Sequence, residues 1–127
     1  MKRLAALAFV IGLSGVAFGD AHVMGNNKTL TIDCAKDKSA MVMGNQNTIT
    51  MTGTCSSLSV QGNKNIIKSE TATAVDVLGN DNTVTVTAAD TISITGNTNH
   101  VSWKKGATGK APSVTDTGKD NKVTQTK

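Results

Sequence analysis

Apolar and polar residues alternate along most of this chain, and the alternation restarts at a recurring Gly-Asn tetrapeptide. The tetrapeptide occurs six times, the last time with Lys in place of the first Asn, and its glycines are 19, 18, 17, 17 and 22 residues apart: Gly25, Gly44, Gly62, Gly79, Gly96 and Gly118. Val, Ile or Leu lies five residues after every one of these glycines, and Val or Ile lies two residues before the first five. Mostly polar residues, rich in Thr, fill the positions between. A period of two with β-branched residues on one side predicts strands that bury one face.

The longer period predicts the architecture. A unit of this length must stack on copies of itself, because no single unit can bury its own apolar face. We therefore expect an all-β fold, a short parallel β-solenoid (β-helix) of about six rungs. A rung is one turn of the solenoid, and each is expected to hold two short strands, a Gly-Asn-x-Asn turn and a second turn.

The turn residues predict a further regularity. Glycine adopts backbone angles closed to other residues, and asparagine tolerates the left-handed region. In turns stacked in register, asparagine amides can hydrogen-bond from rung to rung as a ladder. We expect one column of Asn45, Asn63, Asn80 and Asn97, and a second of Asn47, Asn65, Asn82, Asn99 and Asn121. A polar ligand-binding stripe is the alternative use of these side chains.

The first residues have the features of an export signal. Met1-Lys2-Arg3 is basic, the run from Leu4 to Val16 is apolar, and Ala17-Phe18-Gly19 provides a small-residue cleavage site. We expect a signal peptide at 1–19, with an alternative cut after Ala21, and a solenoid domain at 20–127 in the periplasm or outside the cell. The apolar run is too short for a stable transmembrane helix, so no membrane span is expected.

Charge and composition narrow the function classes. Without Lys2 and Arg3 the chain has 11 lysines and 9 acids, a net charge of +2, which is too small to indicate a nucleic-acid partner. The acids are scattered and no nucleophile–base spacing is visible, so we expect neither an enzyme nor a cofactor. Trp103 is the one aromatic residue after the signal, at an inward position where it would plug the core.

The two cysteines predict a covalent clip. Cys34 and Cys55 lie nine and eleven residues after their own turn glycines, in adjacent rungs. Stacking would bring their Cα atoms close to the range of roughly 4.4–6.8 Å that disulfides require. In an exported chain, two cysteines indicate one disulfide.

The C-terminal region departs from the repeat. Residues 104–113 contain two glycines, three lysines and Pro112, which predicts an inserted mobile loop. Residues 114–127 form a polar terminal rung, in which Asp116 and Gln125 occupy positions that are apolar in most other rungs. A polar last rung is typical of a cap on a repeat protein.

The repeated Val-x-Gly-Asn-x-Asn-Thr-Ile/Val-x-Val pattern after a signal peptide resembles the bacterial secreted family called domain of unknown function 3060. The segment from Thr52 to Gly62, which contains Cys55, strengthens the resemblance. The likeness covers most of Asp20 to Trp103 and fades in the last rung. It implies an envelope or secreted β-rich protein with no assigned activity. A weaker resemblance is to curli-type repeats, although their flanking glutamines are missing.

These observations favour an exported, non-enzymatic structural or interaction protein that makes contact through its Asn- and Thr-rich faces. A metal or ligand-binding module is the alternative, because stacking would gather His22, Met24, Met41 and Met43 into one patch. Such soft ligands suit Cu(I), whereas a structural interpretation treats the methionines as exposed or gap-filling residues at an edge.

The N-terminal edge raises the question of self-association. The Val23–Ile32 rung has no polar cover, and an open sheet edge is normally protected. Pairing of two such edges would give a dimer, whereas head-to-tail stacking would give a curli-like filament. Because the C-terminal rung is polar, we expect a monomer or an edge-paired dimer.

Overall fold

The computed structural model describes residues 20–127 as a β-solenoid of about six turns built from strands alone. The predicted signal peptide, residues 1–19, lies outside the described residues. The strands are β2 (Asp20–Met24), β3 (Thr29–Asp33), β4 (Ser39–Met43), β5 (Thr48–Asn63), β6 (Ile66–Asn80), β7 (Thr83–Ala88), β8 (Thr91–Asn97), β9 (His100–Lys105), β10 (Ser113–Lys119) and β11 (Lys122–Gln125). The predicted fold class is confirmed.

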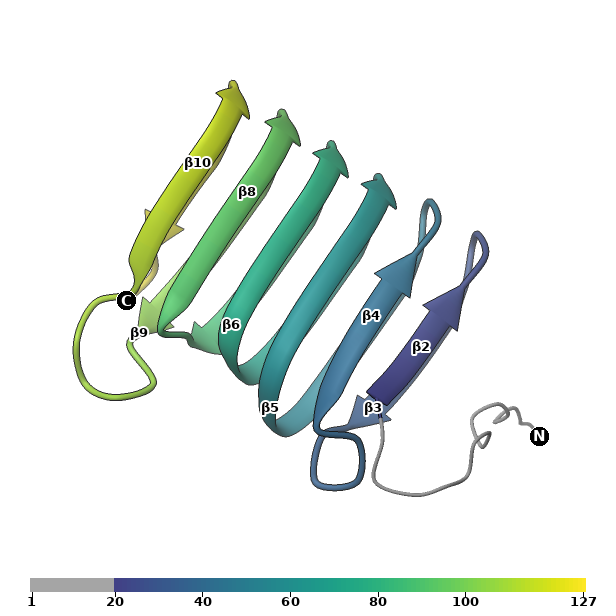
Figure 1. Cartoon of the computed structure of the whole chain (residues 1–127), viewed down its shortest axis with the longest axis horizontal. Helices are drawn as coiled ribbons and strands as arrows, with labels where there is room; N and C mark the ends of the chain where they lie inside the picture. The colour runs from purple at the N-terminus through teal and green to yellow at the C-terminus, as the bar shows by residue number, and fades with distance from the viewer. Residues whose placement is uncertain (1–19) are drawn as a thin grey trace.

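The strands form two parallel rows that face each other (Figure 1). One row runs β2, β4, the second half of β5, the second half of β6, β8 and β10. The other row runs β3, the first half of β5, the first half of β6, β7, β9 and β11. Repeat glycines align in the register, as Gly62, Gly79, Gly96 and Gly118 do.

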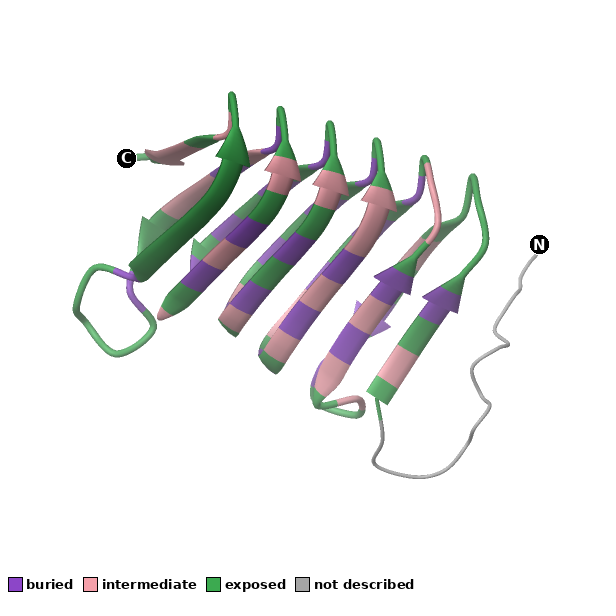
Figure 2. Cartoon of the chain, turned by 45° about the horizontal axis from the view of Figure 1, so that its top comes forward, coloured by how far each residue is buried: buried purple, intermediate pink, exposed green. Residues whose placement is uncertain are grey.

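The inward positions form one continuous core between the two rows. Burial alternates along most of the strands, as in β7 and β8 (Figure 2), which is expected for a sheet with one solvated face. Ile49, Ile67, Val84 and Val101 are stacked in register and fully buried. Trp103 packs against the core but is only half-buried.

The reversals between the two rows differ from the expected pair of turns. The tetrapeptide beginning with glycine lies at one side of the solenoid, for example between β4 and β5. At the other side, β5 and β6 continue around the corner as strand, so the expected second turn does not interrupt these two rungs. The corner of β5 instead uses Gly53, at φ 81°, beside a register shift between Met51 and Thr54.

The glycine of the repeat is required for stacking as well as for its backbone angle. Gly62 has φ 130°, and a Cβ added to it would overlap the carbonyl oxygen of Gly44 in the preceding rung. The same overlap recurs at Gly44, Gly79 and Gly96, each against the glycine before it. Gly25 differs because it belongs to the first rung of the described residues, and an added Cβ would meet only the Lys28 side chain there, at 3.3 Å.

The C-terminal rung and the loop before it close that end. The loop spans residues 106–112 between β9 and β10, so Lys104, Lys105 and Ser113 belong to strands (Figure 1). Thr108 donates both its backbone N–H and its hydroxyl to Asp90 Oδ1, at 2.9 and 3.1 Å. Every residue of β10 is exposed, including Val114 and Asp116 at its inward positions.

Candidate functional site

The outer asparagines are linked from rung to rung in one direction. The backbone N–H of Asn63 donates to Asn45 Oδ1 at 2.9 Å, and that of Asn80 donates to Asn63 Oδ1 at 3.0 Å. Asn97 continues the series with a 3.0 Å bond to Asn80 Oδ1. Each bond therefore runs from a later rung to the amide of the rung before it. The column starts one rung earlier than predicted, because Asn26 Oδ1 accepts from Asn45 N–H at 2.8 Å.

The inner asparagines are linked in the opposite direction. Asn47 N–H donates to Asn65 Oδ1 at 2.9 Å, Asn65 N–H to Asn82 Oδ1 at 3.0 Å, and Asn82 N–H to Asn99 Oδ1 at 3.0 Å. Asn99 N–H donates to Asn121 Oδ1 at 2.9 Å. Each inner amide nitrogen also donates back to the repeat glycine of the preceding rung, as Asn65 Nδ2 does to Gly44 O at 2.9 Å.

Burial separates the roles of the two columns. The inner residues Asn47, Asn65, Asn82 and Asn99 are 0–1 % exposed, and both ends of each amide are hydrogen-bonded. A buried amide is tolerated only when its hydrogen bonds are made inside the protein. The inner column is therefore a structural spine. The outer column faces solvent at Asn63, Asn80 and Asn97 and can contact other molecules.

Each column ends on a lysine in place of asparagine. Lys28 occupies the inner position of the first rung, where its N–H donates to Asn47 Oδ1 at 2.8 Å. Lys119 occupies the outer position of the last rung, where its N–H donates to Asn97 Oδ1 at 3.1 Å. A lysine side chain has no acceptor oxygen, so neither residue can extend its column to a further rung. The sequence did not identify these two lysines as ladder ends.

The third residue of each tetrapeptide was also missed. These residues have φ angles of 57–60°: Asn27, Gln46, Lys64, Asp81, Thr98 and Asp120. The left-handed conformation was expected at Asn and Gly, but the chain places Gln, Lys and Thr there as well. Stacking of the neighbouring glycine and asparagine fixes the backbone of the third residue, which therefore adopts the strained left-handed conformation even where it is Gln, Lys or Thr.

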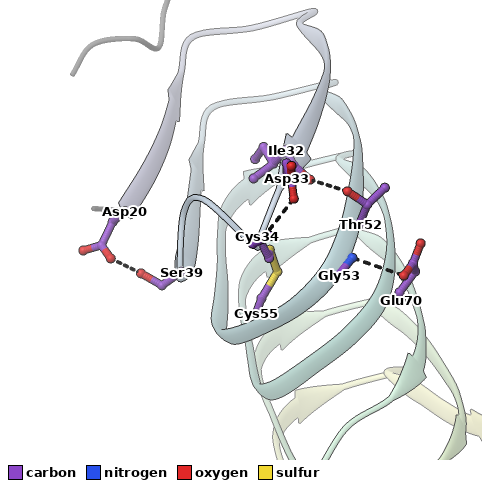
Figure 3. Close-up of a disulfide and its surroundings, with 10 residues drawn as sticks. Asp20, Ile32, Asp33, Cys34, Ser39, Thr52, Gly53, Cys55 and Glu70 are labelled. Carbon is purple, nitrogen blue, oxygen red and sulfur yellow. Dashed lines mark hydrogen bonds between the residues drawn. A yellow bond between two sulfur atoms is a disulfide. The ribbon is translucent and has the colours of Figure 1, made fainter. Parts of the chain in front are cut away.

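A disulfide joins the first two rungs (Figure 3). Cys34 and Cys55 are bonded, with their Cα atoms 5.0 Å apart and both side chains buried. Cys34 N–H also donates to Thr52 O at 2.9 Å. At the start of β2 the Ser39 hydroxyl donates to Asp20 Oδ1, which fastens β2 to β4 in the same region. The N-terminal edge is thus held to the solenoid on both of its sides.

The four predicted metal-ligand side chains are brought together on β2 and β4. In the register of these strands His22 lies beside Met41, and Met24 lies beside Met43. All four are outward residues, and the side chains of Met24 and Met43 are 65 % and 36 % exposed. We call His22, Met24, Met41 and Met43 the thioether patch.

Pairs of threonines lie on the outward surface of the other row, that of β3, β7 and β9. Thr29, Thr31, Thr48, Thr50, Thr83 and Thr85 are all exposed, and we call them the threonine face. Thr29 pairs with Thr48 and Thr31 with Thr50. Ile66 and Lys68 interrupt the array before Thr83 and Thr85.

Other titratable side chains are dispersed. Among residues 20–127, no three His, Cys, Asp or Glu side chains gather into a group that could hold a metal ion. A shallow polar hollow follows the turns, lined by Asn45, Asn63 and Asn80 with the adjoining Gln46, Lys64 and Asp81. The described part of the chain contains no helix long and apolar enough to cross a membrane.

Residues 42–90 and 71–120 each match the family described as "Protein of unknown function (DUF3060)". Together the two matches span 42–120, which is more than half of the chain. The chain belongs to this family. Neither a curated protein nor a solved structure matches it.

The DUF3060 matches follow the repeat. They overlap, and each contains three repeat glycines: Gly44, Gly62 and Gly79 in the first, and Gly79, Gly96 and Gly118 in the second. The matched region begins later and ends later than the resemblance read from the sequence. It omits the first rung, with β2 and β3, and includes the loop 106–112 and all of β10.

Proposed function

We propose that this member of the DUF3060 family is an exported, non-enzymatic structural or interaction protein of the bacterial envelope or extracellular space. Its rigid solenoid presents the outer asparagine column and the threonine face to a partner. The proposed export rests on the sequence features of residues 1–19. The disulfide supports the same compartment, because such bonds persist where thiols are oxidised.

The use of the buried polar side chains carries this proposal. Among the described residues these are Asn47, Asn65, Asn82, Asn99 and Ser69, and the four asparagines are fully committed to stacking the rungs. Enzyme sites characteristically place perturbed titratable groups in a cleft. Here the hydrogen-bonding capacity of the interior maintains the shape of the molecule.

Export is tested by fractionating a bacterial host that produces the full chain. We expect the protein outside the cytoplasm, with an intact mass that fits cleavage after Gly19 or Ala21 and an oxidised Cys34–Cys55 pair. A chain with an uncleaved leader and two free thiols in the cytoplasmic fraction would contradict the proposed location.

The contact role is tested by complementation in the bacterium that makes the protein. In a strain from which the gene has been deleted, we expect the wild-type gene to restore the lost function. A gene that carries Thr50→Lys with Thr85→Lys, on the threonine face, should fail to restore it. Thr95→Lys with Thr117→Lys is the matched control, since it adds the same charge to exposed positions of the opposite row. Equal effects of the two pairs would reject the threonine face as the contact surface.

A further inference from the structure

The thioether patch concentrates soft ligands that other rungs do not have. Beyond β4 the same two outward columns continue through Ser59 and Gln61, Asp76 and Leu78, Ser93 and Thr95, and Thr115 and Thr117. Three of the four methionines in residues 20–127 belong to the patch, and the fourth, Met51, is buried in the core. Met24 and Met43 are among the exposed large hydrophobic side chains of the described residues, and Leu78 is the one other large apolar residue in these columns.

The register fixes the spacing of the four side chains. Paired residues on neighbouring strands are about 4.8 Å apart, and residues i and i+2 on one strand are separated by about 6.6 Å. His22, Met24, Met41 and Met43 therefore start from the corners of a rectangle of roughly this size. Two rotatable bonds place each methionine sulfur and a third turns its methyl group, so the three sulfur atoms can converge above the rectangle.

The ligand set selects the kind of ion. Thioethers are soft, uncharged donors, and imidazole accepts the same late transition metals. Hard cations such as Ca²⁺ and Mg²⁺ require oxygen ligands. We propose that the thioether patch binds one soft monovalent ion, Cu(I), through the sulfur atoms of Met24, Met41 and Met43 and one imidazole nitrogen of His22.

The surroundings hold the two strands at the required spacing. The Ser39–Asp20 hydrogen bond fastens β2 to β4 at one end of the pair (Figure 3), and Gly25 N–H donates to Met43 O at 3.0 Å at the other. The cysteines are joined to each other, which leaves thioethers as the sulfur ligands on this surface. The site thus depends on the first two rungs and is separate from the threonine face proposed for partner contact.

The test is a Cu(I) titration of the purified protein, with its N-terminus defined by intact mass and ascorbate as the reductant. We expect one Cu(I) per chain in native mass spectra, and one Ag(I) when silver is used as the second probe. Competition with a chromogenic Cu(I) chelator gives the affinity. X-ray absorption should report sulfur ligands together with nitrogen.

Two conservative variants separate the patch from general effects. Met41→Leu with Met43→Leu keeps the apolar volume and removes two of four ligands, so affinity should fall about 100-fold or more, beyond what loss of an outer partner typically costs. Met51→Leu is the matched control because this side chain lies in the core, and it should bind as the wild type does. His22→Ala should weaken binding and reduce the nitrogen signal.

Three outcomes would overturn the proposal. These are no stoichiometric adduct in the wild type, equal loss in Met51→Leu, and binding that appears only when the intact mass shows a reduced disulfide. Complementation by the Met41→Leu, Met43→Leu variant in copper-limited and copper-rich medium is a separate readout. If the wild type bound no Cu(I) and the Met41→Leu, Met43→Leu variant still complemented the deletion, the copper site would be rejected. The proposed contact role of the threonine face would be unaffected.

Discussion

Ser69 is the one buried side chain among residues 20–127 whose hydroxyl has no hydrogen-bond partner. It lies seven residues after Gly62, in register between Met51 and Val86. An unsatisfied buried hydroxyl costs about 1–3 kcal/mol. Ser69→Ala should therefore raise the free energy of unfolding by about 1 kcal/mol or more, measured by denaturant titration. Ser59→Ala, on the outward surface, is the control and should change it by less than about 0.5 kcal/mol.

The repeat glycines give a second prediction at the residue scale. Gly25→Ala and Gly62→Ala both place a Cβ at a positive φ, but only the second meets the backbone of a preceding rung. We expect Gly62→Ala to lower the free energy of unfolding by at least about 2 kcal/mol more than Gly25→Ala. If the two variants are equally damaging in thermal melts, an unseen partner covers Gly25, and the N-terminal edge is not open.

The sequence could predict some residues of the ladder and not others. Asparagine at the second and fourth positions of the tetrapeptide identifies both columns, because the amide is the group that the ladder needs. Lys28 and Lys119 take part through backbone N–H groups, which every residue except proline provides, so their side chains carry no signal. The left-handed conformation of the third positions could not be predicted for a similar reason. Stacking of the neighbouring residues imposes this conformation on Gln46, Lys64 and Thr98, whose side chains do not favour it.

At the scale of the elements, the disulfide decides how firmly the first strands are held. Within residues 20–127, β2 and β3 have a neighbouring rung on one side only, and Cys34 lies directly after β3. The disulfide closes a loop between residues 21 positions apart, which contributes on the order of 3 kcal/mol to the free energy of unfolding. Cys34→Ala with Cys55→Ala should lower stability by about that amount and should speed hydrogen exchange most in β2, β3 and β4.

The distribution of the exchange is the informative part of that experiment. β8 and β9 lie several rungs away, so their protection should fall only as far as global stability does. Uniform loss of protection over the whole solenoid would show that the clip acts on the fold as one unit. Unchanged exchange in β2–β4 would show that the Ser39–Asp20 bond and the ladder suffice.

The elements themselves were predictable to different degrees. Alternating apolar residues and evenly spaced glycines specify the strands, their inward faces and their register, because both periods must be satisfied together. The corner opposite the tetrapeptides was not foreseen as continuous strand. In β6 the corner residues around Ser69 to Thr73 include neither Gly nor Pro, so no local signal states where that strand bends, whereas the corner of β5 contains Gly53.

At the scale of the whole molecule, the two ends do not complement each other. Head-to-tail stacking would set Lys119 of one molecule against Asn26 of the next, whose N–H would need an amide oxygen as acceptor. It would also set Asn121 of the first molecule against Lys28 of the next, and the N–H of Asn121 would lack an amide oxygen in the same way. It would also bury Asp116, which accepts from Asn121 Nδ2 at 2.7 Å, against Val23. We therefore expect the wild type to sediment as a monomer or an edge-paired dimer and to give no thioflavin signal.

The triple variant Lys28→Asn, Asp116→Val, Lys119→Asn tests this account. It supplies amides to both columns and removes the charge from the junction, so it should form head-to-tail oligomers that grow with concentration. Lys104→Asn, Lys105→Asn, Asp76→Asn makes the same change in net charge at exposed positions outside the tetrapeptides and should remain unassociated. Fibres in the wild type, or equal association of both triple variants, would contradict the proposed role of the terminal lysines.

The opposed directions of the two columns also constrain how such a protein can become longer during evolution. An interior rung, such as the 17-residue unit that separates Asn63 from Asn80, has complete partners on both sides. Duplication of that segment within the gene would insert a copy that fits its neighbours at once. A copy appended at either terminus would instead meet Lys28 or Lys119. Lengthening from the middle, with the two ends retained, is the route that this hydrogen-bond pattern leaves open.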